Sequence, residues 1–437
     1  MPPLATPSPS SRTPENKRFF MNLKRVVVTG LGSLTPLGND TASTWRSMLT
    51  GVSGASPITR FDTTNFKCKI ACEVKGFNPL DYFDRKEVKK LDLFTQYGLV
   101  ASEEAILDSG ILNYPIDKTR IGVIWGSGNG GVTSFQEEMR EYVRGNDIPR
   151  FSPFFCTRMI ANICAGQISI KHGFRGPNYC TVAACASSAA AIADAFNLVR
   201  LGKADAIVAG GSEAAVVECS IGGFGSMQAL SCRNDDPLTA SRPFDRDRDG
   251  FVLGEGAGAL ILEDLEHAQR RGAKIYAELT GCGFSSDAYH VTASHPDGLG
   301  AMLAMQEAVR ESEMPLEAVE HINMHGTSTP IGDISEPHAI AKLFCEHAPT
   351  ISLTSTKSMT GHLLGAAGSV EAIATIMALN DGIIPPTINH FNDDPNIAPL
   401  HFVFNKAERR DIHFALSNSF GFGSHNISLA FRSMEGA

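Results

Sequence analysis

Cys185 has a setting suited to nucleophilic chemistry in this chain of 437 residues. It follows a short apolar run at residues 181–184 and precedes small, helix-favouring residues at 186–196. A thiol at this junction would lie at a helix N-terminus, where unpaired N–H groups and the helix dipole stabilise a thiolate. A buried, unreactive thiol is the alternative here, and it is what we expect of the other nine cysteines.

Two histidines and a lysine follow later strand-like runs. His325 comes directly after residues 322–324, whereas Lys357 and His362 lie between another such run and the small-residue helix expected at 363–374. Neutral imidazoles can donate N–H hydrogen bonds to a thioester carbonyl and stabilise an enolate, as decarboxylative carbon–carbon bond formation requires. A pair of structural histidines is the alternative.

Three other patterns resemble ligand sites without completing one. Residues 126–131 match a dinucleotide-binding turn, but no second strand ending in a ribose-binding acid follows. The acidic residues of 245–249 begin like a calcium loop, yet Gly256 stands where the bidentate acid belongs. His290 and His295 lack a third ligand nearby in the sequence. We therefore predict neither a nucleotide cofactor nor a metal.

Short β-branched runs alternate with longer helical patterns from residue 25 onward, which indicates an α/β architecture with buried, largely parallel strands. The first five runs are residues 25–29, 121–125, 181–184, 206–209 and 257–262, and the second five are 275–280, 321–324, 351–354, 413–417 and 426–431. Five followed by five predicts an internal duplication, with two halves that meet near residue 270. Catalytic residues of doubly wound sheets follow the carboxyl ends of strands, as Cys185, His325 and residues 420–423 do.

Composition excludes several classes of protein. The 43% of hydrophobic residues can form a large core or two fused ones. Lys and Arg number 38 against 47 Asp and Glu, a net charge of −9 without a long basic run, so nucleic-acid binding is not expected. The apolar stretch at 184–196 is shorter than the about 18 residues of a membrane helix. Ten scattered cysteines without a Cys-x-x-Cys pair predict reduced thiols and a cytoplasmic location.

Residues 1–23 are expected to form a disordered extension, because the first twenty are rich in Pro, Ser and Thr and precede Met21. They make a poor transit peptide and contain no signal-peptide core, so a start at Met21 is an alternative to Met1 and an organelle is not excluded. The rest divides into an N-terminal half, 24–270, with the cysteine nucleophile, and a C-terminal half, 271–437, with the two histidines.

Four segments together resemble the signature blocks of the elongating β-ketoacyl-[acyl carrier protein] synthases, most closely the type II branch of bacterial fatty-acid synthesis. They are Ala-Cys185-Ala-Ser, Asn-Met-His325-Gly-Thr-Ser-Thr-Pro-Ile-Gly-Asp333, Ser-Thr-Lys357-Ser-Met-Thr-Gly-His362-Leu-Leu-Gly-Ala-Ala-Gly and Asn418-Ser-Phe-Gly-Phe-Gly423. The likeness runs from about residue 24 to 432. The order Cys, His, His separates this branch from the initiating synthases, whose second histidine is asparagine, and from thiolases with two cysteines.

The resemblance implies a thiolase-like fold, in which two duplicated halves form an α-β-α-β-α layered architecture, usually as a homodimer. It implies a decarboxylative Claisen condensation of malonyl-[acyl carrier protein] with an enzyme-bound acyl group, which lengthens a fatty acyl chain by two carbons. The expected partner is acyl carrier protein, whose phosphopantetheine carries the substrates, and no further cofactor is expected.

Residue roles also follow from the resemblance. Cys185 would accept the acyl chain, His325 and His362 would bind the malonyl thioester carbonyl, and the N–H groups of Cys185 and Phe422 would form the oxyanion hole. Lys357 would support the site together with Glu336, and Phe422 would gate the acyl pocket. The other expected residues are Glu336 and Asp333 for support, Thr327 and Thr329 for the phosphopantetheine arm, Phe224, Phe420 and Asn129 for the acyl chain, and Lys67 and Lys69 for carrier-protein docking.

Some positions depart from the family pattern and put the acyl-chain preference in doubt. Asn129 stands where a pocket isoleucine is usual, and Ser424 replaces a glycine of the gate loop. A buried amide would disfavour long saturated chains, unless Asn129 bonds to backbone within its glycine-rich turn. Asn129 therefore favours an alternative, a ketosynthase of a dedicated polyketide or polyene pathway. A non-catalytic, chain-length-determining partner subunit is a further alternative, against which Cys185 argues.

Overall fold

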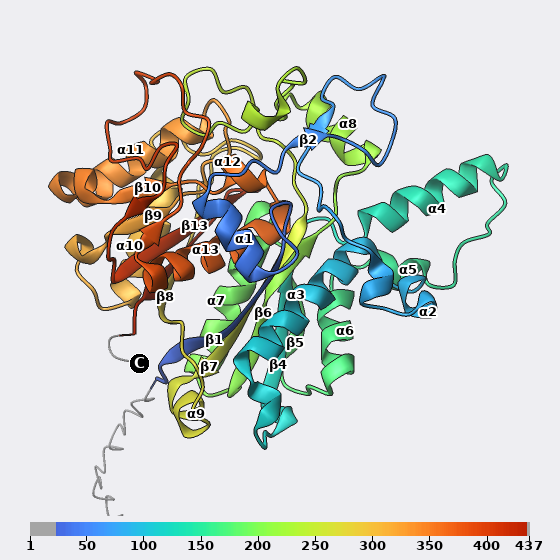
Figure 1. Cartoon of the computed structure of the whole chain (residues 1–437), viewed down its shortest axis with the longest axis horizontal. Coiled ribbons are helices and arrows are strands. Elements are labelled where there is room, and N and C mark those ends of the chain that lie inside the picture. The colour runs from blue at the N-terminus through green and yellow to red at the C-terminus, as the bar shows by residue number, and fades with distance from the viewer. Residues whose placement is uncertain (1–22, 435–437) are drawn as a thin grey trace, which may run out of the picture.

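A computed structural model describes residues 23–434 of the chain (Figure 1). Residues 1–22 lie outside the described part, and with them nearly all of the extension predicted at 1–23. The division of the chain near residue 270 stays a prediction about domains. Among the described residues we find no helix with both the length and the apolar character that crossing a bilayer requires.

One sheet of ten strands runs through the molecule, and each of the ten predicted runs contributes a strand to it. From one edge to the other, the strands are β5 (Asn178–Thr181), β4 (Ile121–Gly126), β6 (Ala206–Glu213), β7 (Gly256–Asp264), β1 (Val26–Leu34), β8 (Ala277–Ser286), β14 (His425–Arg432), β13 (Phe414–Gly421), β9 (His321–Asn323) and β10 (Ser352–Thr354). Four short strands form two separate hairpin-like pairs, β2 (Ser56–Pro57) with β3 (Ile70–Ala71) and β11 (Ile383–Ile384) with β12 (Glu408–Arg409).

The two halves of this sheet have the same topology. In each half the strands lie in the order third, second, fourth, fifth, first of their own sequence. Going inward from the outer edge, two parallel pairings are followed by two antiparallel ones in both halves. The halves join where β1 pairs antiparallel with β8 at Val26–Leu279, Val27–Glu278 and Val28–Ala277. The predicted duplication is therefore confirmed.

The expectation of largely parallel strands is wrong. Only two of the four pairings in each half are parallel, and the strands nearest the join run antiparallel to their neighbours. A buried antiparallel strand has the same continuous apolar pattern as a buried parallel one, so the residue pattern does not reveal direction. The connections decide it: β13 and β14 are joined by a tight turn, which requires them to run in opposite directions.

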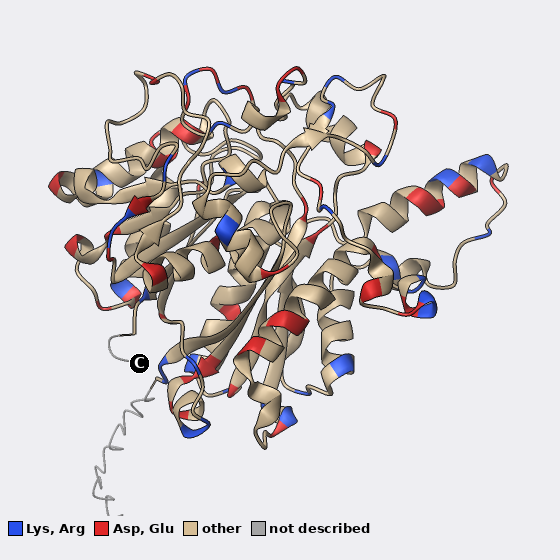
Figure 2. Ribbon diagram, viewed as in Figure 1, with Lys and Arg blue, Asp and Glu red and all other residues tan. Residues whose placement is uncertain are grey.

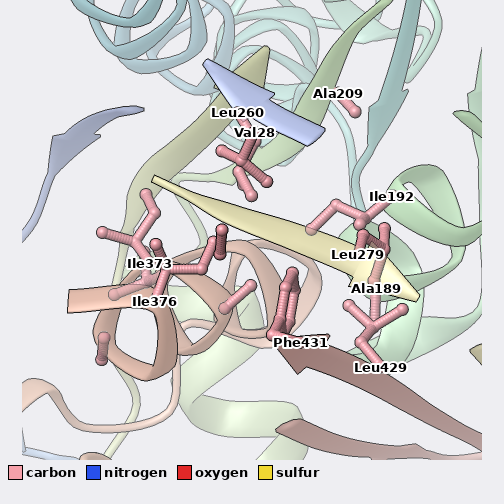
Figure 3. Packing of buried hydrophobic residues seen from close by; sticks show 14 of the residues in the cluster. Val28, Ala189, Ile192, Ala209, Leu260, Leu279, Ile373, Ile376, Leu429 and Phe431 are labelled. Atoms are coloured by element: carbon pink, nitrogen blue, oxygen red, sulfur yellow. The ribbon is translucent and has the colours of Figure 1, made fainter. Parts of the chain in front are cut away.

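Helices form three layers around the two sheet halves. The middle layer consists of α7 (Ser187–Arg200) and α13 (Ala367–Asp381), whose side chains share one core with both halves. Figure 3 shows Ile192 of α7 and Ile373 of α13 in this core, together with Leu260 and Leu279 from the two halves of the sheet.

One outer layer, α3 (Leu93–Ser109) and α6 (Ile163–His172), covers the first half of the sheet. The other outer layer, α10 (Leu299–Glu311) and α11 (Gly332–Phe344), covers the second half. Together with the middle helices, these layers give the α-β-α-β-α order that the sequence predicted. The remaining helices are α1 (Thr41–Leu49), α2 (Arg85–Val88), α4 (Val132–Arg144), α5 (Phe155–Met159), α8 (Glu218–Ser226), α9 (Leu265–Arg270) and α12 (Lys357–Thr360).

Charged residues of both signs lie interspersed over the outer helices and loops, while the strands at the centre carry few (Figure 2). Helix α4 extends away from the body of the molecule, beside α5 (Figure 1). This projecting arm exposes apolar side chains, among them Phe135 and Val143.

The prediction that all cysteines are reduced thiols is wrong for one pair. Cys68 and Cys232 form a disulfide, with their Cα atoms 4.5 Å apart across a sequence separation of 164 residues. The other eight cysteines are free. Cysteine spacing predicts disulfides only in small, cysteine-dense chains, whereas here the fold brings two distant loops together.

Strand β1 and helix α3 approach so closely that β1 has no room for a side chain at Gly32. A Cβ atom there would lie 2.0 Å from the carbonyl oxygen of Ala101. We expect Gly32→Ala to lower the free energy of unfolding by about 1–3 kcal/mol in urea titrations, because backbone must move to admit the methyl group. Gly166→Ala in α6 is the matched control, since a Cβ there meets no atom within 4 Å. Equal losses in both variants would contradict the packing argument.

Candidate active site

Cys185 lies on a sharp turn that leads directly into α7. Strand β5 ends at Thr181, earlier than predicted, and a 3-10 turn, Ala184–Ala186, carries the cysteine. Ala184 has a left-handed backbone with a φ of 48°, a conformation that costs a non-glycine residue about 1–2 kcal/mol. The hydroxyl of Ser187 stabilises the turn, because it accepts from the N–H of Ala183 at 3.0 Å and donates to the carbonyl of Ala184 at 2.7 Å.

A cavity of about 320 Å³ opens over this turn and brings together most of the predicted site. Segments from both halves of the chain contribute its walls. Its lining includes Cys185, His325, His362, Thr327, Thr329, Phe224, Phe420 and Phe422. The sequence predicted all eight, although Phe224 comes from helix α8 and not from a strand end.

The two histidines face one another across this cavity. Their ring centroids are 5.4 Å apart, and the ring planes are nearly perpendicular at 85°. His362 also contacts the ring of Phe251, and His325 contacts that of Phe420. Among the described residues, Nδ1 of His325 and both ring nitrogens of His362 are buried without a hydrogen-bond partner. Buried polar atoms are rarely left unpaired, so these nitrogens are available to a ligand in the cavity.

Both histidines are held neutral. Burial lowers the pKa of His325 and that of His362 well below the usual value, and the positive charge of Lys357 lowers each further. A neutral imidazole carries one N–H donor and one acceptor nitrogen. At neutral pH each ring therefore has one N–H group that can donate a hydrogen bond to a carbonyl oxygen.

Lys357 is buried below the cavity and forms an ion pair with Glu371 of α13. Burial raises the pKa of Glu371 to about 7, although the charge of Lys357 opposes the shift. The sequence analysis missed Glu371 and assigned the supporting carboxylate to Glu336. A signal was present, because Glu371 is the one charged residue in the otherwise small and apolar run of residues 363–374.

Glu336 holds the backbone beside His325. Its carboxylate accepts the N–H of His325 at 3.0 Å and that of Gly326 at 3.1 Å, and Nδ2 of Asn418 donates to it at 3.0 Å. Burial raises the pKa of Glu336 to about 6. Glu336 thus positions the histidine main chain, while Glu371 pairs with the lysine.

Asp333 supports the neighbouring turn, which carries Thr327 and Thr329. It accepts the N–H of Phe244 at 2.8 Å and lies 3.7 Å from the guanidinium of Arg248. Arg248 in turn donates to the carbonyl of Thr329 at 3.1 Å. Burial raises the pKa of Asp333 to about 6, against the opposing charge of Arg248. The two threonine hydroxyls are 3.1 Å apart at the cavity wall.

The thiol itself does not behave as its place at a helix N-terminus predicted. Burial raises the pKa of Cys185 to about 12, which outweighs the opposing effects of Lys357 and of the backbone N–H of Phe422. The low-dielectric cavity penalises the thiolate more than the helix end stabilises it. A thiolate here therefore depends on the nearby positive charge.

The turn between β13 and β14 carries Phe422 and is tied to a neighbouring loop. The N–H of Gly423 donates to the carbonyl of Val291 at 2.8 Å, and the hydroxyl of Ser424 donates to that of His290 at 3.3 Å. Ser424 adopts a φ of 71° although it replaces the glycine usual there. Its hydroxyl bond helps to offset that strained conformation.

Six predicted residues do not line the cavity, and three of them, Lys357, Glu336 and Asp333, are buried. The other three are Asn129, Lys67 and Lys69. Asn129 is exposed, and its N–H donates to the carboxylate of Glu213 at 3.1 Å. Lys67 and Lys69 lie on the loop before β3, where the side chain of Asn234 bonds to the backbone of both. In the part of the chain that the structure describes, no group of three or more His, Cys, Asp or Glu side chains could hold a metal ion.

Comparisons with known proteins agree with this geometry. The model of the "Beta-ketoacyl synthase, N-terminal domain" family matches residues 23–268, and that of the "Beta-ketoacyl synthase, C-terminal domain" family matches residues 276–391. A curated relative from Synechocystis, named 3-oxoacyl-[acyl-carrier-protein] synthase 2, is 49% identical over 94% of this chain and 98% of its own.

Two solved structures share the fold over 94% of this chain and the whole of their own. One is a β-ketoacyl synthase from Burkholderia phymatum, with 33% identity and a TM-score of 0.88. The other is a ketosynthase in complex with the acyl carrier protein of a type II polyketide synthase, with 32% identity and a TM-score of 0.87. Since both family models and a near-full-length relative match, the chain belongs to the β-ketoacyl synthase family.

Proposed function

We propose that the protein condenses malonyl-[acyl carrier protein] with an acyl group held on Cys185 and releases carbon dioxide, so that a fatty acyl chain grows by two carbons. The observation that carries the proposal is one cavity lined by a buried thiol and two neutral histidines with unpaired ring nitrogens. The name of the Synechocystis relative, a 3-oxoacyl-[acyl-carrier-protein] synthase, supports the same reaction.

In the first half-reaction the Cys185 thiolate attacks the thioester carbonyl of an acyl carrier protein. A carbon–sulfur bond to the enzyme forms, and the oxyanion is stabilised by the N–H groups of Cys185 and Phe422. The bond to the phosphopantetheine sulfur then breaks, and that sulfur leaves as a thiolate that takes up a proton. Lys357 favours the charged form of Cys185 at the start of this step.

In the second half-reaction His325 and His362 donate hydrogen bonds to the thioester carbonyl of the malonyl group. The bond to the carboxylate breaks, carbon dioxide leaves, and its electron pair forms an enolate on the carbonyl that the histidines hold. The enolate carbon attacks the acyl carbon on Cys185, and the cysteine sulfur departs. Because both rings are neutral, they supply N–H donors over a wide range of pH.

The substrate arm would follow the threonine side of the cavity. Thr327 and Thr329 lie on its wall and can bond to the amides of phosphopantetheine, while Phe224 and Phe420 offer apolar surface to the acyl chain. A solved relative was captured with an acyl carrier protein, which supports such a protein as the partner. Apart from the phosphopantetheine that the carrier brings, we assign no cofactor.

We also propose a homodimer that forms along strand β5. This strand is the edge of the sheet and exposes Tyr179, while Val182 and Ile170 beside it are 64% and 76% exposed. The unpaired edge of a sheet, with exposed apolar side chains beside it, can pair with a strand of a second chain. The projecting helix α4 also exposes apolar side chains, Phe135 and Val143. The cytoplasmic location and the absence of nucleic-acid and membrane partners stay predictions from the sequence.

A polyketide or polyene pathway would use the same chemistry, and a solved relative belongs to a polyketide synthase. The residue that favoured this alternative, Asn129, is exposed and does not line the cavity. Single-turnover assays with saturated and with conjugated acyl carriers separate the two pathways. A preference for conjugated chains would support the polyketide alternative, and a preference for saturated chains the fatty-acid function.

Substitution of either histidine should separate the two half-reactions. We expect His325→Ala and His362→Ala each to lower malonyl decarboxylation by at least about 10²-fold, the usual effect of removing one oxyanion donor. Acylation of the cysteine should suffer much less, because the thiol has its own oxyanion hole. Cys185→Ala is the control, since it should abolish acylation. A histidine variant that decarboxylates normally but is not acylated would contradict these roles.

Lys357→Met should raise the pKa of Cys185, because the positive charge that favours the thiolate is lost. At pH 8 we expect alkylation of Cys185 by iodoacetamide to slow by at least about threefold, which corresponds to half a pKa unit. Peptide mapping by mass spectrometry distinguishes Cys185 from the exposed Cys156 and Cys219. Lys342→Met, an exposed lysine on α11, is the control. An unchanged or faster rate in Lys357→Met would show that this lysine does not support the thiolate.

Carrier docking at Lys67 and Lys69 is tested by charge reversal. Acyl carrier proteins are acidic, so the double variant Lys67→Glu, Lys69→Glu should repel them. We expect its KM for the carrier at low salt to rise by at least about threefold, because each exposed ion pair with the carrier would contribute up to about 1 kcal/mol. The effect should shrink at high salt. Lys86→Glu, an exposed lysine on α2, is the control. An unchanged KM would place the docking surface elsewhere.

A further inference from the structure

Glu213 is a buried carboxylate to which the reaction steps above give no part. It is the last residue of β6 and has no solvent exposure. Within residues 23–434, no lysine, arginine or histidine side chain forms an ion pair with it. An ionised carboxylate without a cation is costly to bury unless N–H groups surround it.

Backbone N–H groups from two separate turns supply that environment. Gly128 and Gly365 donate to Oε2 of Glu213 at 2.8 and 3.1 Å, and Asn129 donates to Oε1 at 3.1 Å. Gly128 and Asn129 belong to the turn after β4, whereas Gly365 lies in the 3-10 turn Leu364–Ala366. The carboxylate therefore fastens these two turns to the end of β6.

The turn that carries Gly365 and the turn that carries Gly128 approach each other so closely that a side chain at Gly365 would collide with backbone. A Cβ atom on Gly365 would lie 2.7 Å from Oε2 of Glu213 and 2.3 Å from the nitrogen of Gly128. Residue 365 must therefore be glycine for the carboxylate to reach the two N–H groups at once.

Both turns adjoin the segments that carry Cys185 and His362. Gly365 follows Leu364, which lines the cavity, and comes three residues after His362. On the other side, a Cβ on Gly128 would lie 3.4 Å from the carbonyl oxygen of Ala184, the residue before Cys185. Glu213 thus joins the turn that follows His362 to the turn that adjoins the Cys185 segment.

The charge of Glu213 also acts on the thiol. Two charged groups influence the pKa of Cys185 in opposite directions, since Lys357 lowers it and Glu213 raises it, while His325 and His362 are neutral. Burial raises the pKa of Glu213 itself to about 7, against the effect of its N–H donors. The neutral form of Glu213 consequently predominates well below pH 7 and the charged form well above it.

We propose that Glu213 is a positioning residue that fixes the turn after His362 against the turn after β4, which adjoins the Cys185 turn, and, when ionised, opposes formation of the thiolate. The positional part rests on the proposed condensation, because it predicts a loss in malonyl decarboxylation. The electrostatic part does not, because alkylation of the thiol needs no substrate. Two variants separate the effect of the Glu213 charge from the effect of its side-chain length.

Glu213→Gln removes the charge and keeps the length of the side chain. We expect Cys185 of this variant to react with iodoacetamide at the wild-type rate at pH 5.5, where Glu213 is neutral, and at least about threefold faster at pH 8.5. Greater access to a loosened site would raise the rate equally at every pH. A ratio of rates that stays constant across this range would overturn the electrostatic part.

Glu213→Asp keeps the charge but is one methylene shorter, so it cannot reach all three N–H groups. We expect kcat for malonyl decarboxylation to fall by about tenfold, as for one lost hydrogen bond of about 1.4 kcal/mol. KM and the pH profile of alkylation should stay near wild type. Decarboxylation at the wild-type rate in Glu213→Asp would overturn the positional part. If Glu213→Gln does not fold, the result for Glu213→Asp is the test of the proposal.

Glu104→Gln is the matched control, because Glu104 also accepts two backbone N–H groups, from Ser33 and Thr41, each at 2.8 Å. It lies on α3, away from the cavity lining. It should change neither the ratio of alkylation rates nor decarboxylation. If wild-type protein did not decarboxylate malonyl-[acyl carrier protein], the proposed function would fail, while the alkylation comparison would still test Glu213.

Discussion

Close packing of two helices between the halves of the sheet is the constraint on which the site depends. A Cβ on Gly368 of α13 would lie 2.9 Å from Ala189 of α7, and the hydroxyl of Ser188 accepts the N–H of Ser369 at 2.9 Å. Cys185 immediately precedes α7, and His362 precedes α13 by a few residues. Small residues where these helices meet thus bring Cys185 and His362 together, although they are 177 positions apart in the sequence.

A single buried cation then influences the charge state of three groups in the cavity. Burial lowers the pKa of both histidines, and Lys357 lowers each further and partly offsets the cost of forming a thiolate at Cys185. Burying an unpaired ammonium group would itself be unfavourable. The ion pair between Lys357 and Glu371 offsets that free-energy cost. The lysine can therefore act on three groups without touching the substrate. The charge of Glu213 has the opposite effect to that of Lys357, because it raises the pKa of the thiol.

The fold could be predicted from the sequence to the level of its elements. Each buried strand has its own β-branched run, so all ten were found, and their five-plus-five spacing indicated the duplication. Strand direction could not be predicted in this way, because apolar runs are the same in either direction. The end of β5 was also misplaced, since residues 182–184 are apolar but turn away from the sheet to form the approach to Cys185.

The sequence by itself determined which residues could do the chemistry, because Cys185, His325, Lys357 and His362 stand in short local motifs. Tertiary structure alone decided their partners and charge states. Glu371 replaced Glu336 as the lysine's partner, and Cys68 joined Cys232 across 164 residues. Burial, which depends on the whole fold, raised the pKa of the thiol that a helix end was expected to lower. Local motifs fix the type of a side chain, whereas pairing and solvation depend on segments far apart in the chain.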